Sequence, residues 1–304
     1  MIIDVHSHLG NILEFNGGEL IDKTGVKKEK IIDLVSVSEA GLNRTYGLGS
    51  LPYAIFRHWV TKAERARNAT ATLENMRLSL DEAGVDYTVC LPIAPYVTFD
   101  NLRKACKKEK RIIPFTSADF TDPKTTASKL DTDVKNGAYG LKLHPIIQKV
   151  RCTDAQTLEV LQTFKKHKKP VLIHAGISTY YLGKEKFRNN PEYGNIKDIE
   201  KVVRTFPDIN FIIGHSGLFQ VNEVIKRLKG CGNVWVDTSF QSPWIIRKLI
   251  NAFGAERVMY ASDWPFGYRP PAIKAVKLAC KGDTILEVML FYKNAAMLLS
   301  LKMI

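Results

Sequence analysis

The sequence has few cysteines and no long apolar run. Its five cysteines are odd in number, widely scattered and free of any C-x-x-C pairing, which argues against a disulfide framework and favours a reducing compartment. No stretch approaches the roughly 20 apolar residues that cross a bilayer. The opening residues lack the basic and apolar regions of a signal peptide. We therefore expect a cytoplasmic protein with no membrane partner.

The chain is strongly basic, but its lysines are not arranged as a nucleic-acid site. Its 44 Lys and Arg against 31 Asp and Glu give a formal net charge of +13, which could attract phosphate. The lysine clusters fall on or after expected helices, where solvated lysine is ordinary. No RNA-binding aromatic motif or zinc-finger spacing accompanies them. We expect a small-molecule substrate, which this charge allows to be anionic, and no nucleic-acid partner.

Short β-branched runs alternate with longer amphipathic segments along the chain. This alternation predicts parallel strands joined by crossover helices. The predicted strands are residues 2–5, 87–91, 112–116, 140–143, 171–173, 210–213, 234–236 and 258–261. The clearest predicted helices are residues 70–83, 155–167, 196–205, 219–229 and 243–252. Eight strand and helix units predict an α/β chain folded as a (β/α)8 TIM barrel, with one domain over residues 1–304.

A closed barrel is favoured over an open doubly wound sheet by where the polar side chains fall. Chemistry-bearing residues follow five of the eight runs, and only in a barrel do all these strand ends converge on one rim. The connection after the first strand, residues 9–68, is far longer than usual and is predicted to be a lid-like insertion. Barrels of this kind often pair through their outer helices, so a homo-oligomer is a further expectation.

Two histidines, His6 and His8, stand one residue apart at the end of the first predicted strand. Side chains two apart on a strand point the same way, so both imidazoles can reach one ion. Three more candidates repeat this placement: His174, His215 and Asp263 each follow an apolar run at a strand end. Three neutral imidazoles and one carboxylate fit a zinc or manganese site that keeps one position for water.

The same motifs resemble a known family. His6-x-His8, the Ile-His-Ala-Gly around His174, the Gly-His-Ser-Gly around His215 and the final Ser-Asp-Trp-Pro resemble the amidohydrolase superfamily. Within it, the chain is most similar to the amidohydrolase-related group, which includes hydrolases and decarboxylases such as aminocarboxymuconate semialdehyde decarboxylase. The resemblance runs from residue 2 to about 300. It implies that His6, His8 and His174 bind the metal and that Asp263 binds the metal or its water.

The resemblance leaves two roles open for His215, either a ligand of a second metal or a group that polarises the substrate, and we favour the second. One ion is therefore expected rather than two, with zinc favoured over manganese. Lys142 and His144 share a face of the fourth strand and can both enter the cavity. In some amidohydrolases a lysine here is carbamylated and bridges two metals. We favour an ammonium that binds an anionic substrate or pairs with a carboxylate.

The expected reaction is hydrolysis of an amide, lactone or ester-like bond. A metal lowers the pKa of bound water from near 16 to about 7. Asp263 can take the proton as the water attacks and pass it to the leaving group, while the metal and His215 stabilise the oxyanion. Residues expected to contact the substrate from the loops are Trp264, Arg269 and Tyr180.

Three alternatives stand beside hydrolysis. A non-oxidative decarboxylase would use the same metal to hold a carboxylated substrate. A deoxyribonuclease of the TatD type also opens with His-x-His, but it carries a metal-bridging glutamate where this chain has Ser117, Ala118 and Lys142. A non-catalytic binding protein is disfavoured because every expected ligand is present.

Overall fold

The computed structural model describes residues 1–301 and contains nine short parallel strands in two sheets. The first sheet holds β1 (Ile3–Ser7), β2 (Tyr87–Cys90) and β3 (Ile112–Pro114). The second holds β4 (Thr116–Ser117), β5 (Leu141–Leu143), β6 (Val171–His174), β7 (Phe211–Gly214), β8 (Val234–Asp237) and β9 (Val258–Met259). All neighbouring strands pair in parallel and in chain order.

Backbone hydrogen bonds join the two sheets at both edges. Phe115, between β3 and β4, donates to Cys90 O at 3.0 Å, and Thr116 donates to Gly140 O at 2.8 Å, so β3 and β4 are one strand that changes partner. At the other edge, Val5 donates to Tyr260 O at 3.1 Å, and Asp263 donates to His6 O at 2.8 Å. The eight predicted runs therefore form a ring of parallel strands, and the TIM-barrel prediction is confirmed.

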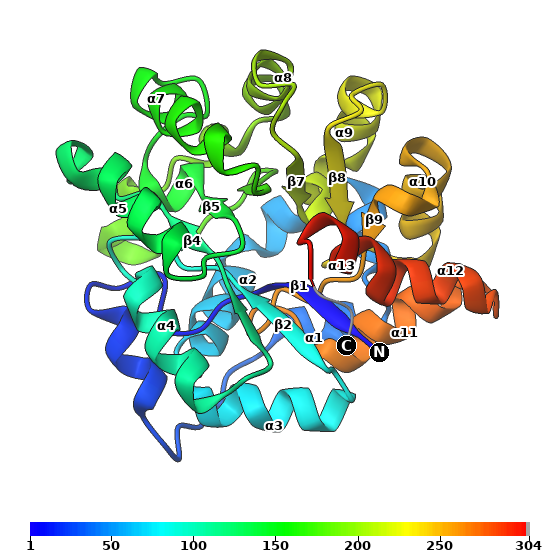
Figure 1. The fold of residues 1–304 in the computed structure, drawn as a ribbon. Helices are drawn as coiled ribbons and strands as arrows, with labels where there is room; N and C mark the ends of the chain where they lie inside the picture. Colours follow the sequence, from blue (N-terminus) through cyan, green and yellow to red (C-terminus); the bar gives the residue numbers. More distant parts are fainter. Residues whose placement is uncertain (302–304) are drawn as a thin grey trace.

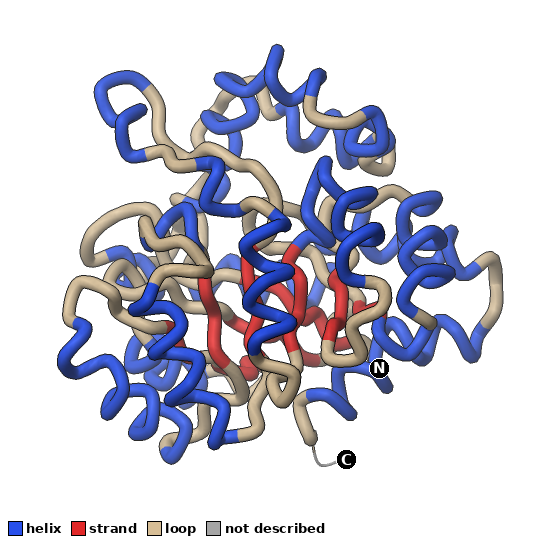
Figure 2. Tube along the Cα trace, turned by 90° about the horizontal axis from the view of Figure 1, so that it is seen from above, coloured by secondary structure: helices blue, strands red, loops and turns tan. Residues whose placement is uncertain are grey.

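Helices surround this ring (Figures 1 and 2). The helices that alternate with the strands are α3 (Leu73–Ala83), α4 (Phe99–Lys108), α5 (Pro123–Lys135), α7 (Ala155–Phe164), α8 (Ile196–Thr205), α9 (Val221–Leu228), α10 (Pro243–Phe253) and α11 (Arg269–Cys280). Each of the five predicted helices is present, with ends shifted by up to three residues. A short α6 (Pro145–Gln148) follows β5, and α12 (Thr284–Val288), a π-helix (Met289–Lys293) and α13 (Asn294–Leu298) end the described fold.

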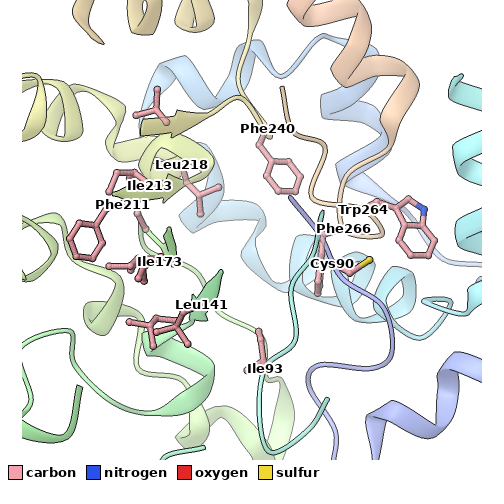
Figure 3. Close-up of a cluster of buried hydrophobic side chains, with 14 of the residues drawn as sticks. Cys90, Ile93, Leu141, Ile173, Phe211, Ile213, Leu218, Phe240, Trp264 and Phe266 are labelled. Atoms are coloured by element: carbon pink, nitrogen blue, oxygen red, sulfur yellow. The ribbon is translucent and has the colours of Figure 1, made fainter. Parts of the chain in front are cut away.

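Strand side chains alternate between two apolar cores. Leu172 and Ile212 face the barrel interior, where Ala295 and Leu299 of the C-terminal segment also pack, while their neighbours face the helices. Figure 3 shows part of the cluster between strands and helices. By the same alternation Lys142, whose strand neighbours pack outward, faces inward. This is why the middle of β5 can contribute a charged group to the site.

The first strand departs from regular alternation. Its register against β2 shifts between Asp4 and Ser7. Val5 packs in the interior core, and the next residue, His6, also turns toward the site instead of toward the helices. A β-bulge redirects side chains in this way and is common beside functional sites. The bulge therefore places His6 and His8 on one side while Ser7 bonds on the other side, to Thr88.

The insertion after β1 contains more helix than the sequence indicated. It holds α1 (Leu34–Ala40), α2 (Leu51–Asn68) and 3-10 helices at Gly17–Asp22 and Arg44–Leu48. Pro52 suits the first turn of α2, and Arg65 and Arg67 in its last turn suit the negative end of the helix dipole. In Figure 1 the N-terminus and α13 lie on the near side of the barrel, and α2 lies on the distant side. Within residues 1–301, none of the helices combines the length and the hydrophobicity that a bilayer-spanning segment needs.

Candidate functional site

Three predicted ligands meet at the strand ends. The Nε2 atoms of His6 and His8 each lie 3.4 Å from Oδ1 of Asp263. All three residues are buried, and Asp263 Oδ1 has no hydrogen-bond partner. Two donors held about 2.1 Å from one ion in tetrahedral geometry stand about 3.4 Å apart, so the observed spacing is that of a metal site. The donor set therefore fits a divalent cation.

The far side of each imidazole is fixed by an acceptor. His6 Nδ1 lies 2.8 Å from Asp237 Oδ2, and His8 Nδ1 lies 2.8 Å from the carbonyl oxygen of Leu91. Because both partners accept, Nδ1 carries the hydrogen in each ring and Nε2 keeps its lone pair for a ligand. Burial raises the pKa of Asp237 to about 6, while hydrogen bonds from Ser239 act against this rise. Sequence reasoning missed Asp237.

A second pair of imidazoles, His174 and His215, lies beside the first. Ser239 Oγ donates to Asp237 Oδ1 at 2.6 Å and lies 2.8 Å from His215 Nδ1, so it accepts from that nitrogen. His215 Nε2 then accepts from His174 Nδ1 at 3.1 Å. This chain leaves the buried Nε2 of His174 with a lone pair and without a partner. This arrangement favours His174 as the metal ligand, with His215 in a position to orient its ring.

The distances between ligand atoms favour His215 over His174 as a metal ligand. Among the described residues, the ligand atoms that all lie within 4.8 Å of one another belong to His6, His215 and Asp263. His8 approaches Asp263 but is not in this group, and neither is His174. The hydrogen bonds favour His174 instead, because His215 Nε2 already accepts a bond, whereas His174 Nε2 does not. The roles of His174 and His215 stay predictions.

Burial sets the charge state of the cluster. It lowers the pKa of His6, His8, His144, His174 and His215 well below 6.5, which leaves neutral rings. Burial also lowers the pKa of Lys142 to about 7, against the opposite effects of Asp263 and Asp237. Lys142 Nζ lies 3.2 Å from His6 Nε2. A lysine with this pKa readily becomes neutral and can release that contact when a cation binds.

Asp263 is held by the backbone and by a buried network beneath it. Its backbone adopts φ of 60°, and its carbonyl accepts from Gly267 N at 3.0 Å. Next to it, Ser262 donates from its backbone and hydroxyl to Asp4 at 2.9 and 2.6 Å. Asp4 also accepts from Arg269 Nε at 3.0 Å. Asp4, which is fully buried, thus ties the first strand to the loop that carries Asp263.

Two of the three loop residues expected to contact the substrate, Trp264 and Arg269, are buried away from the cavity. Arg269 is fully buried under the rim with Asp4, Ser7 and Ser79, so the structure corrects its predicted substrate contact to a structural one. Trp264 is also buried, with its ring 5.1 Å from the Arg269 guanidinium, and points away from Phe240 in Figure 3. Neither residue lines the cavity at the cluster.

Tyr180 and His144 do line this cavity. Their side chains are joined by a 3.2 Å contact between Tyr180 Oη and His144 Nε2. His144 Nδ1 accepts from Ile147 N at 3.3 Å, so Nε2 is the nitrogen that donates to the tyrosine. The His144 ring also stacks on His174 with 4.0 Å between centroids. Both residues are therefore available to contact a substrate beside His174.

One further carboxyl, which sequence reasoning missed, enters the cavity from the insertion. Glu64 of α2 is buried, lines the cavity and has no partner for Oε2. Burial raises the pKa of Glu64 to about 8, against the opposite effect of Arg67. At neutral pH it is largely a protonated acid that can donate a hydrogen bond.

Comparisons with known proteins agree with this fold. The Amidohydrolase family model matches residues 3–301. A TIM-barrel protein of unassigned function from Bordetella bronchiseptica is similar, with 17% identity, 98% of each chain covered and a TM-score of 0.68. The search of curated proteins found no match.

Two solved enzymes share the fold at low identity. A 5-carboxyvanillate decarboxylase from Novosphingobium aromaticivorans, complexed with manganese and 4-hydroxy-3-methoxy-5-nitrobenzoic acid, has 15% identity, 99% and 96% coverage of this chain and its own, and a TM-score of 0.68. A probable 2-pyrone-4,6-dicarboxylic acid hydrolase from Acinetobacter baumannii, with citric acid bound, has 14% identity, 98% and 99% coverage, and a TM-score of 0.59. The family model spans almost the whole chain, and the chain belongs to the amidohydrolase family.

Proposed function

We propose that this protein is a metal-dependent hydrolase that cleaves an amide, lactone or ester-like bond of a small molecule. The observation that carries the proposal is Asp263 Oδ1, which is buried, has no hydrogen-bond partner and lies 3.4 Å from the Nε2 atoms of His6 and His8. His6, His8, His174 and Asp263 would hold one divalent cation. Zinc suits this nitrogen and oxygen set, and manganese, which the 5-carboxyvanillate decarboxylase binds, suits it as well.

Such an ion lowers the pKa of water and polarises a carbonyl group. Asp263 accepts the proton of the attacking water on a carboxylate oxygen and returns it to the leaving group. Its second oxygen, Oδ2, lies 3.9 Å from His215 Nδ1. Asp237 holds His6 in one tautomer, and His215 does the same for His174. Lys142 and His144 offer donors to an anionic group of the substrate.

Hydrolysis is supported by the family model, which is described as Amidohydrolase and matches residues 3–301. A probable 2-pyrone-4,6-dicarboxylic acid hydrolase is among the proteins that share the fold. We therefore place hydrolysis first.

Non-oxidative decarboxylation is the second candidate. It is favoured by the structural neighbours, which include 5-carboxyvanillate decarboxylase and 2,6-dihydroxybenzoate decarboxylase. A carboxylate on the ion would also lie near Lys142, and Asp263 could protonate the carbon that loses carbon dioxide. Both reactions would use the same residues, so the product that is released must distinguish them.

The test loads the purified protein with zinc or manganese and offers two substrate panels. One contains lactones, esters and amides, including 2-pyrone-4,6-dicarboxylate, and the other contains carboxylated phenols, including 5-carboxyvanillate and 2,6-dihydroxybenzoate. We expect acid release from the first panel that requires the metal and disappears in Asp263→Asn. Carbon dioxide release from the second panel without acid release from the first would establish the decarboxylase instead. Turnover that persists without metal would reject both.

A further inference from the structure

The cavity at the metal-ligand cluster is too small for a substrate. Small-molecule sites usually span roughly 300–1,000 Å³, whereas this cavity has about 20 Å³. A much larger chamber, of about 570 Å³, lies next to it between α1, α2 and the 3-10 helix Arg44–Leu48. The insertion therefore lines a space of the size that the cluster lacks.

The chamber has an apolar lining. Val35, Phe56 and Val60 contribute to it, with few polar side chains among their neighbours. Tyr53, Phe56 and Val60 follow helical spacing on one face of α2, and Glu64 continues the same face into the small cavity. Phe56 is 48% exposed, so part of this apolar surface meets solvent. A ligand in the chamber would remove that surface from water.

An aromatic wall separates the chamber from the cluster. Tyr46, Tyr53 and Phe219 line both spaces. Tyr46 stacks on Phe219 with 4.6 Å between ring centroids, and Tyr53 lies 5.0 Å from Phe219. On the cluster side, Phe240 lies 5.7 Å from Tyr46 and 5.6 Å from the His215 ring. These three side chains therefore lie at the border between the chamber and the small cavity.

We propose that this chamber is the subsite for the apolar part of the substrate, and that Tyr46, Tyr53 and Phe219 part to join it to the small cavity. The inference rests on the proposed function, because it places the polar end of the substrate at the cluster. The substrate class is a carboxylic acid or its lactone, ester or amide that carries an apolar ring or chain. The wall is fastened mainly by Tyr53, whose hydroxyl lies 2.9 Å from Thr179 Oγ1 and accepts from Thr179 N at 3.0 Å.

Burial of a methylene group predicts the size of the effect. Each methylene moved from water into an apolar site contributes about 0.8 kcal/mol, which is about a fourfold gain in affinity. A series of 4-alkylbenzoates, from benzoate to 4-hexylbenzoate, should therefore bind the metal-loaded protein progressively more tightly until the chamber is filled. Isothermal titration calorimetry measures this slope on the wild-type protein.

The matched variants are Val60→Phe, which fills the chamber, and Ile55→Phe, which adds a similar ring on an exposed part of α2 outside the lining. We expect Ile55→Phe to keep the wild-type slope and Val60→Phe to flatten it. Nuclear Overhauser contacts between the alkyl protons and the Val60 methyl groups of wild type provide a readout that needs no variant.

The outcomes separate the inference from the proposed function. Metal-dependent binding of benzoate with no gain along the series overturns the subsite alone. An equal slope in Val60→Phe, together with no contact to the Val60 methyl groups, also overturns it. If no member of the series binds the metal-loaded protein, the subsite for this substrate class is overturned, whereas the proposed hydrolysis is decided by the substrate panels.

Discussion

The barrel rim and the insertion face the same cavity, but their side chains are held in different ways. On the rim, His6 and His8 sit at a strand end, and each has a buried acceptor behind its ring. In the insertion, α2 is tied down mainly by side chains, such as Arg67 to Glu39 and Thr61 to Thr179, and Glu64 is left unpaired. We infer that the barrel backbone holds the cluster in place, and we propose that the insertion controls access and recognition.

The largest effect should come from the rim. In Asp263→Asn an amide replaces a ligand that must also take a proton, so we expect activity to fall by about ten-thousandfold and metal affinity to fall with it. Steady-state rates on the substrate found by the panels and equilibrium dialysis with zinc measure the two losses. Asp100→Asn, at an exposed carboxylate, is the control and should change neither. Full zinc affinity in Asp263→Asn would remove the carboxylate from the metal site.

In the insertion, the unpaired Glu64 should make the free energy of unfolding depend on pH. The pKa of Glu64 is raised to about 8 in the folded protein against 4.5 for an ordinary glutamate. Below pH 4.5, Glu64 is protonated in both the folded and the unfolded protein. Between pH 4.5 and 8 it ionises in the unfolded protein only, so the free energy of unfolding falls as the pH rises through this window. Glu64→Gln removes the loss, at most about 5 kcal/mol. Denaturant unfolding should show Glu64→Gln gaining on wild type from pH 5 to 8, and a difference independent of pH would contradict the assignment.

Each of the two regions contains one buried arginine, so matched substitutions allow a direct comparison. Arg67 in the insertion pairs with Asp33 and Glu39, and Arg269 under the rim pairs with Asp4. Breaking a buried pair costs about 3–5 kcal/mol. We expect Arg269→Met to lower the global free energy of unfolding and metal affinity together. Arg67→Met should leave metal affinity within about threefold while making α2 sensitive to proteolysis. Loss of metal binding in Arg67→Met would show that the two regions are not separable.

The smallest expected difference is in zinc affinity between variants of the neighbouring residues His174 and His215. Removal of a ligand should weaken metal binding more than removal of the group that orients it, which usually costs about 10–100-fold. We therefore expect His174→Ala to lower zinc affinity further than His215→Ala, as measured by competition with a chelator. The reverse order would make His215 the ligand, as the 4.8 Å grouping with His6 and Asp263 suggests.

The sequence could predict the rim because its pattern is local. His6, His8 and Asp263 each follow a strand, and parallel strands bring their ends to one place. The same signal was present for Asp237, which ends the Val-Trp-Val run of β8, and could have identified it. The bulge in β1 had no such signal, because the shift depends on pairing with β2.

The insertion could not be predicted in this way. Buried positions on α2 include Glu64 and Arg67, so its inner face does not stand out as apolar. The prediction for Arg269 was wrong for a related reason. Its place after the loop that carries Asp263 suggested a substrate contact, but it pairs with Asp4, which is 265 residues away in the sequence. Polar groups buried by distant partners become visible only in three dimensions.

We propose that His6, His8 and Asp263 hold one catalytic cation. Metal analysis of the dialysed protein, combined with a crystal structure of the zinc-loaded form, tests this arrangement. We expect one ion per chain, about 2.0–2.2 Å from His6 Nε2, His8 Nε2 and an oxygen of Asp263, with Lys142 unmodified. Two ions bridged by a carbamylated Lys142, or no ion at these three atoms, would contradict it.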